Sequence, residues 1–163
     1  MIKLRWYGLL ATLLLLASSS PSLAELGYQT WGLRGGVGVD PDQGIIGMHW
    51  NLGNFSQRTR LQPNFEVGFG DNATIASLGI PVHYRFGNSP HYTPYAGGGV
   101  LLGYIDYDRA KSGSSSDWFI EPLAVVGIEW PLSGGGELFV ELDLSFGDAQ
   151  DAKLLLGWMR RIR

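Results

Sequence analysis

The sequence of 163 residues contains no cysteine, which excludes both a disulfide framework and a cysteine-linked lipid anchor. Beyond its first residues it also lacks any long apolar run, so no transmembrane helix is expected there. Positive charge is scarce, with 12 Lys and Arg against 15 Asp and Glu. A chain this acidic has no electrostatic basis for binding nucleic acid. If it enters a membrane, it must do so as a closed barrel, because only closure satisfies every backbone group there.

The beginning of the chain has the features of a secretory signal peptide. Lys3 and Arg5 supply a positive start, an apolar run covers residues 6–17, and Ser22-Leu23-Ala24 forms a cleavage site of small residues. The apolar run is too short to span about 30 Å of hydrocarbon as a helix. We therefore expect a cleaved signal peptide over residues 1–24.

The remaining residues 25–163 have the length of one domain. Without Lys3 and Arg5, 10 basic side chains face 15 acidic ones, a net charge of -5. The sequence predicts a single β-barrel domain over this range.

Strict alternation of apolar and polar residues is the main feature of this domain. Near its end, Val140, Leu142 and Leu144 alternate with Glu141 and Asp143. Because successive strand side chains face opposite sides, a period of two predicts strands with one apolar and one polar face. Eight such segments are expected, joined by turns that include a connection over 53–56 and a serine-rich loop over 108–117. They cover about 28–39, 45–52, 60–70, 74–86, 93–107, 118–130, 137–146 and 152–162.

Large aromatic residues lie near the ends of the apolar faces. Two girdles of aromatics are typical of a membrane barrel, whereas a soluble barrel with a ligand cavity would have aromatics through its middle. The expected fold is therefore all-β: an eight-stranded antiparallel up-and-down transmembrane β-barrel. A soluble periplasmic lipid-binding barrel is the alternative. The expected girdles contain Trp31, Trp50, Tyr84, Trp130 and Trp158 at one end, and Phe69, Tyr104, Trp118 and Phe146 at the other.

The segments TPYAGGGVLLGY, AVVGIEWPL, LFVELDLSF and LLLGWMRRI resemble the small outer-membrane β-barrel superfamily around the OmpA transmembrane domain. The resemblance covers essentially the whole chain after residue 24. It implies the outer membrane of a Gram-negative bacterium and insertion by the barrel-assembly machinery. Members of this superfamily usually end in an aromatic residue, whereas this chain ends with Ile162 and Arg163.

The polar faces carry charges of both signs. A charge inside a narrow barrel must be paired or reach water, so we expect a network of ion pairs that fills the lumen. A conducting pore is the rival interpretation, for which eight strands leave little space. The expected network contains Arg34, Glu66, His83, Arg85, Glu121, Glu129, Glu137, Glu141, Asp143, Lys153 and Arg161.

An outer-membrane enzyme that modifies lipid A is the alternative function. Such an enzyme needs a nucleophile and a base at the lipid-facing rim. His91-Tyr92-Thr93 faintly resembles the His-x-Ser of the deacylases, but threonine stands in place of serine, and His49 and His83 are expected inside. We therefore expect no catalytic residue, no metal site and no cofactor.

Aspartates gather in the turns expected on the extracellular side. Their carboxylates could share divalent cations with lipopolysaccharide phosphates, because these hard cations prefer oxygen ligands. This possible divalent-cation rim contains Asp40, Asp42, Asp148 and Asp151. The expected partners are outer-membrane lipid and lipopolysaccharide, with the protein itself a monomer.

Overall fold

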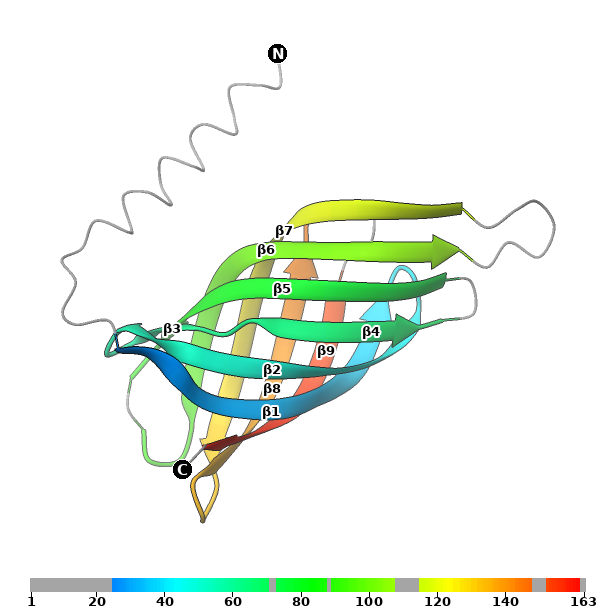
Figure 1. The fold of residues 1–163 in the computed structure, drawn as a ribbon. Helices are drawn as coiled ribbons and strands as arrows, with labels where there is room; N and C mark the ends of the chain where they lie inside the picture. The colour runs from blue at the N-terminus through cyan, green and yellow to red at the C-terminus, as the bar shows by residue number, and fades with distance from the viewer. Residues whose placement is uncertain (1–24, 71–72, 88, 108–114, 148–151, 162–163) are drawn as a thin grey trace.

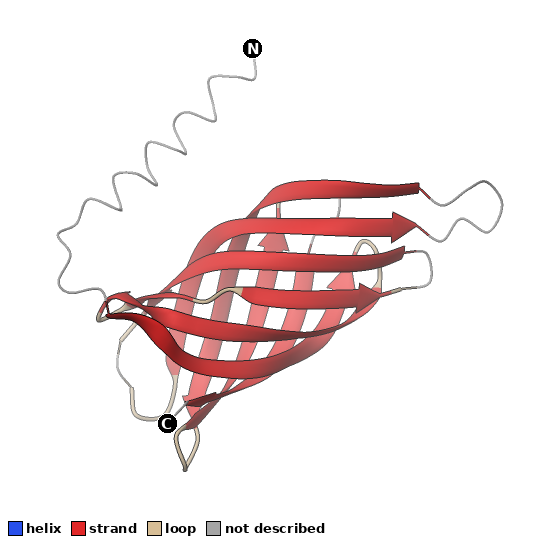
Figure 2. Cartoon of the chain, viewed as in Figure 1, coloured by secondary structure: helices blue, strands red, loops and turns tan. Residues whose placement is uncertain are grey.

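The alternating segments form nine β-strands (Figures 1 and 2). The computed structural model describes residues 25–70, 73–87, 89–107, 115–147 and 152–161, with the backbone alone for 25–28, 115 and 161. The expected signal peptide lies outside these residues and stays a prediction. No helix of the described residues is long and apolar enough to cross a bilayer. The strands are β1 (Glu25–Val39), β2 (Gln43–Ser56), β3 (Thr59–Leu61), β4 (Asn64–Phe69), β5 (Ala73–Arg85), β6 (Thr93–Tyr107), β7 (Ser115–Pro131), β8 (Gly136–Ser145) and β9 (Ala152–Arg161).

The sheet closes on itself. Strand β1 pairs with both β2 and β9, so no edge remains between the first and last strands. Strands β3 and β4 both lie between β2 and β5 and therefore share one position, which gives the barrel eight strand positions. Every pair is antiparallel. The predicted eight-stranded antiparallel barrel is confirmed.

The register fixes the tilt of the strands. When paired residues are followed once around the barrel from Trp118, the path returns to β7 at Ile128, ten residues further along. With a rise of about 3.3 Å per residue and about 4.8 Å between strands, this stagger corresponds to a tilt of about 40°. A barrel of this size has an interior just wide enough for side chains to fill.

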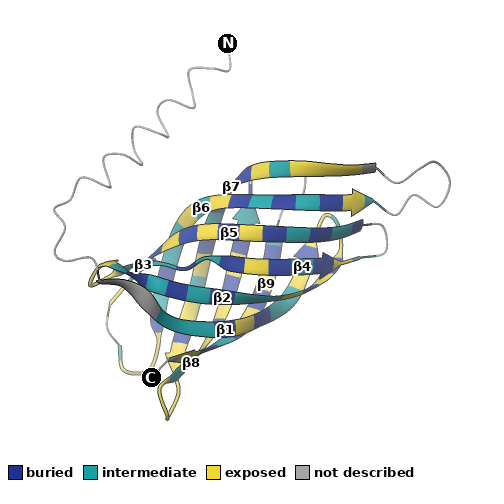
Figure 3. Ribbon diagram, viewed as in Figure 1, coloured by how far each residue is buried: buried dark blue, intermediate teal, exposed yellow. Residues whose placement is uncertain are grey.

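Buried and more exposed residues alternate along the strands (Figure 3), and the buried residues that face inward include most of the charged side chains of the strands. On β8, the side chain of Leu142 is 38% exposed, whereas Glu141 beside it is 1% exposed. Among the side chains that the structure describes, two arginines, one lysine and five carboxylates are buried in the interior. A soluble barrel with a ligand cavity has the opposite arrangement, with apolar side chains inside and polar ones facing water.

Three predicted boundaries were wrong. The segment 53–56, expected as a connection, belongs to β2 and pairs with β1 and β3. The third expected strand is two strands, because Pro63 has no N–H for the ladder. Residues 115–117, expected in the serine-rich loop, begin β7 and pair with the end of β6.

The two ends of the lumen differ in polarity. The terminal end is the end where β1 begins and β9 ends, and the far end is opposite (Figure 1). At the far end, buried Ala73, Ile75 and Ile105 pack together with Tyr107 and Phe119. A second apolar cluster, Tyr95, Leu101, Leu123 and Val125, also contacts Phe119. The sequence did not predict this apolar part of the interior.

Candidate functional site

The middle of the lumen contains a cluster of buried charges around Arg34 of β1. The Nε atom of Arg34 lies 2.8 Å from Oε1 of Glu66 on β4. Its Nη2 atom lies 2.5 Å from Oε1 of Glu141 and 3.2 Å from Oδ2 of Asp143, both on β8. All four side chains are at most 2% exposed. Arg34 therefore joins carboxylates from two distant parts of the barrel wall.

Lys153 and Tyr95 extend this central cluster. The Nζ atom of Lys153 donates a 2.6 Å hydrogen bond to Oε2 of Glu66. The Tyr95 hydroxyl donates to Oε2 of Glu141 at 2.7 Å, and the His83 ring stacks on Tyr95 with ring centroids 4.9 Å apart. Charge-assisted hydrogen bonds of this kind are about twice as strong as neutral ones. Together with the ion pairs of Arg34, they place every carboxylate oxygen of Glu66 and Glu141 beside a cation or a hydrogen-bond donor.

A second ion-pair cluster lies at the terminal end. Both oxygens of the buried Glu129 carboxylate are occupied, one by Nη2 of Arg85 at 2.5 Å and the other by Nη2 of Arg60 at 2.7 Å. Arg60 also lies 3.8 Å from Glu137 and places its guanidinium 5.4 Å from the centre of the Tyr95 ring. Tyr95 thus lies between the two clusters.

Glycines make room for the large rings of the interior. A Cβ atom on Gly157 of β9 would overlap the ring of Phe139, its register partner on β8. A Cβ atom on Gly127 of β7 would overlap Tyr95, its register partner on β6. A ring lying over a cross-strand glycine fills the space that the missing side chain leaves. These glycines are required by close packing, as the crowding of a narrow barrel suggests.

The structure brings most of the sequence-predicted lumen residues into the two clusters. Glu121 lies apart from them, buried beside Gly147 toward the far end. Only the backbone of Arg161 is described. The sequence analysis did not identify Arg60, although it falls on the same alternating, inward-facing positions as Glu66. It also did not identify Tyr95 as an aromatic residue that faces the lumen. The central cluster contains Arg34, Glu66, His83, Glu141, Asp143 and Lys153, and the terminal cluster contains Arg85, Glu129 and Glu137.

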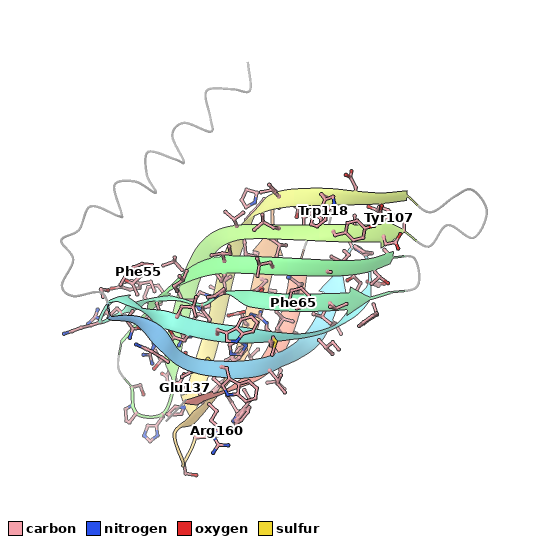
Figure 4. All side chains as sticks on the ribbon, viewed as in Figure 1. Phe55, Phe65, Tyr107, Trp118, Glu137 and Arg160 are labelled. Carbon is pink, nitrogen blue, oxygen red and sulfur yellow. The ribbon has the colours of Figure 1, made fainter. Side chains whose placement is uncertain are left out.

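The residues of the predicted aromatic girdles lie on the outer face. Trp31 pairs with Trp50 in register, and its ring lies 6.2 Å from that of Trp158 near the terminal end. Tyr104 and Trp118 are also register partners, with ring centroids 5.2 Å apart. Trp118 lies near the far end (Figure 4). Tyr84, Trp130, Phe69 and Phe146 are exposed close to strand ends.

The three histidines lie in two different environments. His49 and His83 are fully buried inside the barrel, and His91 lies exposed in the turn between β5 and β6. Within the described ranges, no group of three His, Cys, Asp or Glu residues could hold a metal ion. Asp40 and Asp42 are exposed in the turn between β1 and β2. Asp148 and Asp151 lie outside the described residues, so the divalent-cation rim stays a prediction.

Comparison with known proteins supports the fold. No protein-family model matches the sequence, and no curated protein matches it. The N-terminal β-barrel domain of Pseudomonas aeruginosa OprF is 12% identical, with a TM-score of 0.72 over 86% of this chain and 100% of that one. Neisserial surface protein A is 11% identical, with a TM-score of 0.66 over 83% and 96%.

The attachment invasion locus protein Ail of Yersinia pestis is 11% identical, with a TM-score of 0.60 over 84% of this chain and 100% of that one. That protein was solved in complex with the heparin analogue sucrose octasulfate. These likenesses confirm the predicted resemblance at the level of fold: the chain has the fold of the small outer-membrane barrels.

Proposed function

We propose that the protein is a small integral barrel of a Gram-negative outer membrane, with a structural or interaction role and a closed lumen. The observation that carries this proposal is the filled interior. Arg34 and its carboxylates fill the middle of the lumen, while the apolar cluster around Phe119 fills the far end. A lumen filled in this way leaves no continuous path for ions or solutes.

The outer face supports the membrane location. It is apolar along the strands and carries aromatics near both ends, where tryptophan and tyrosine suit the membrane–water interface. The fold likeness to outer-membrane barrels points to the same compartment. The proposed partners are outer-membrane lipid, lipopolysaccharide and, during biogenesis, the barrel-assembly machinery.

Membrane location is tested by cell fractionation followed by gel electrophoresis of heated and unheated samples. We expect the protein in the outer-membrane fraction, with a heat-dependent change in migration that reports a folded barrel. Recovery in the soluble periplasmic fraction would refute the membrane proposal.

The closed lumen is tested by planar-bilayer recordings of the folded protein. We expect no steady conductance, because the ion pairs and the apolar cluster block the path. Stable channels that also admit small sugars would show that the lumen is open. A lipid A mass profile of a deletion strain tests the absence of catalysis, and an altered acylation pattern would contradict it.

A further inference from the structure

Two exposed arginines lie on the outside of the barrel at its terminal end. Arg160 is on β9 and is labelled in Figure 4, and Arg58 is in the turn between β2 and β3. The other arginine and lysine side chains that the structure describes belong to the lumen, where carboxylates pair with them. In this part of the chain, positive charge on the outer surface is therefore confined to the terminal end.

No carboxylate of the described residues neutralises either arginine, because the ion pairs among these residues all lie in the lumen. The guanidinium of Arg58 donates one long hydrogen bond, 3.5 Å, to the Tyr84 hydroxyl. A guanidinium has five N–H donors and is always charged in proteins. Both side chains therefore keep most of their capacity to bind an anion.

An indole N–H group lies close to Arg160. The register partner of Arg160 on β8 is Gly136, which has no side chain on the outer face. The Nε1 atom of Trp158 lies 3.1 Å from the position that a Cβ atom on Gly136 would occupy. This N–H can only donate, and no residue of the described ranges accepts from it. A guanidinium and a free indole donor thus flank the outward side of Gly136.

These donors lie within the aromatic girdle of the terminal end. Trp31 is the register partner of Arg160 on β1, and its ring lies 6.2 Å from that of Trp158. Tryptophan side chains prefer the level of the lipid headgroups. On the same outer face, exposed Leu138 and Leu156 continue toward the middle of the strands. An anion bound beside Gly136 would therefore have an apolar surface next to it, which suits the acyl chains of a lipid.

We propose that Arg160 and Trp158 bind the phosphate group of an anionic phospholipid in the leaflet at the terminal end. The guanidinium pairs with two phosphate oxygens through parallel hydrogen bonds, and the indole N–H donates to the same group. Arg58 and Tyr84 form a second position of the same chemistry. A headgroup ammonium would offset the phosphate charge, so phosphatidylglycerol suits these positions better than phosphatidylcholine. This inference deepens the proposed function by naming the lipid, and it rests on the membrane location.

NMR of the barrel folded in maltoside micelles tests this chemistry, because these micelles contain no phosphate of their own. Dihexanoyl phosphatidylglycerol is the probe, and the indole N–H and arginine Nε–H signals are followed as it is added. We expect the signals of Trp158 and Arg160 to shift with the same midpoint concentration, since one phosphate contacts both. Dihexanoyl phosphatidylcholine should need about fivefold more, the usual contribution of one arginine at an anionic lipid surface. Equal midpoints for the two lipids, or no shift, would overturn the proposal.

Matched controls locate the site. Arg160→Gln removes the charge and should raise the midpoint of the Trp158 shift about fivefold, whereas Arg160→Lys keeps the charge and should raise it less. The indole signal of Trp118 is the internal control, because the structure describes no exposed arginine at the far end. Equal shifts of Trp118 and Trp158 would show that the lipid has no preferred site. Inorganic phosphate has no acyl chains and should bind more weakly than the lipid, and an equal midpoint would refute the assignment to a lipid.

Spin-labelled phospholipids measure the same preference in bilayers. Averaged over the whole barrel surface, labelled phosphatidylglycerol should associate about twofold more strongly than labelled phosphatidylcholine. Replacing both Arg58 and Arg160 with glutamine should remove most of this difference, and an undiminished preference would refute the location. Salt at about 1 M should also remove it, because screening limits the reach of exposed charges to about 3 Å. Recovery of the protein in a soluble fraction of cells would refute the proposed function, whereas a folded barrel without lipid preference refutes this inference alone.

Discussion

The Nζ atom of Lys153 lies 2.6 Å from Oε2 of Glu66, although 87 residues separate them in the sequence. Lys153 belongs to β9 and Glu66 to β4, with β1 and β2 between them in the barrel wall. The other oxygen of Glu66 contacts Arg34 of β1. One carboxylate thus links three strands across the lumen.

Glu66→Gln should lower the free energy of unfolding by about 3–5 kcal/mol, because it leaves two buried cations without their shared carboxylate. Urea titration of the protein folded in phospholipid vesicles, followed by tryptophan fluorescence, measures this change. Lys153→Met supplies the second arm of a double-mutant cycle. We expect the double variant to lose less free energy of unfolding than the sum of the losses in the two single variants. Additive losses would mean that the two side chains do not interact in the folded protein.

Tyr95→Phe should cost about 1.5–3 kcal/mol, the usual contribution of a hydrogen bond to a charged group. The substitution removes the hydroxyl that donates to Glu141 but keeps the ring that stacks on His83. Tyr104→Phe is the matched control on the outer face of the same strand and should change stability little. The same urea titration compares them, and equal effects would argue against the buried hydrogen bond.

Leu142→Arg should destabilise the barrel or block its insertion. Leu142 faces outward near the middle of β8, where an arginine at the bilayer midplane costs about 2–4 kcal/mol. Phe146→Arg, on the same face just beyond the end of β8, should cost no more than about 1 kcal/mol, since the penalty falls near the interface. Refolding yield into vesicles measures both. An insensitive Leu142 position would mean that this face does not contact lipid.

Gly36→Ala should destabilise the barrel by about 1–3 kcal/mol through overpacking. Its new methyl group would overlap the main-chain oxygen of Leu154, which cannot move as a side chain can. Gly44→Ala is the control on the neighbouring strand, where the nearest atom, the main-chain oxygen of Phe69, is 4.0 Å away. That change should stabilise the strand by about 0.5 kcal/mol. Thermal unfolding in vesicles should separate the two variants in opposite directions.

The inside and outside of the barrel were predictable because alternation assigns every second residue to one face. Leu142 and Glu141 are such a pair, and their exposures differ as the pattern predicts. The apolar part of the lumen was not predictable in this way. Neighbouring residues in β6 and β7 are both apolar, as in Leu101 with Leu102 and Val125 with Val126. No alternation of polar and apolar residues therefore shows which of the two faces inward.

The partners within the lumen also could not be read from the sequence. Arg34 reaches Glu141 because the register of β1, β9 and β8 places the two residues at a similar height along the barrel axis. This register is a property of the closed sheet. The third expected strand contains Pro63, and this proline in the sequence indicates where the strand is divided. Its ladder nevertheless continues, because the carbonyl of Pro63 accepts from the N–H of Trp50.

The ion pairs around Arg34 have a consequence for how the protein assembles. The pairs of Arg34 with Glu141 and of Lys153 with Glu66 join strands from the two ends of the sheet, so they do not exist until the first and last strands meet. A strand that entered hydrocarbon alone would carry an unpaired charge, at a cost of several kcal/mol. Curling of the sheet must therefore accompany insertion, and the strands should enter together as a single cooperative event. The insertion of each strand can be followed separately in vesicles of increasing bilayer thickness. We expect the insertion rate of every strand to fall by the same factor.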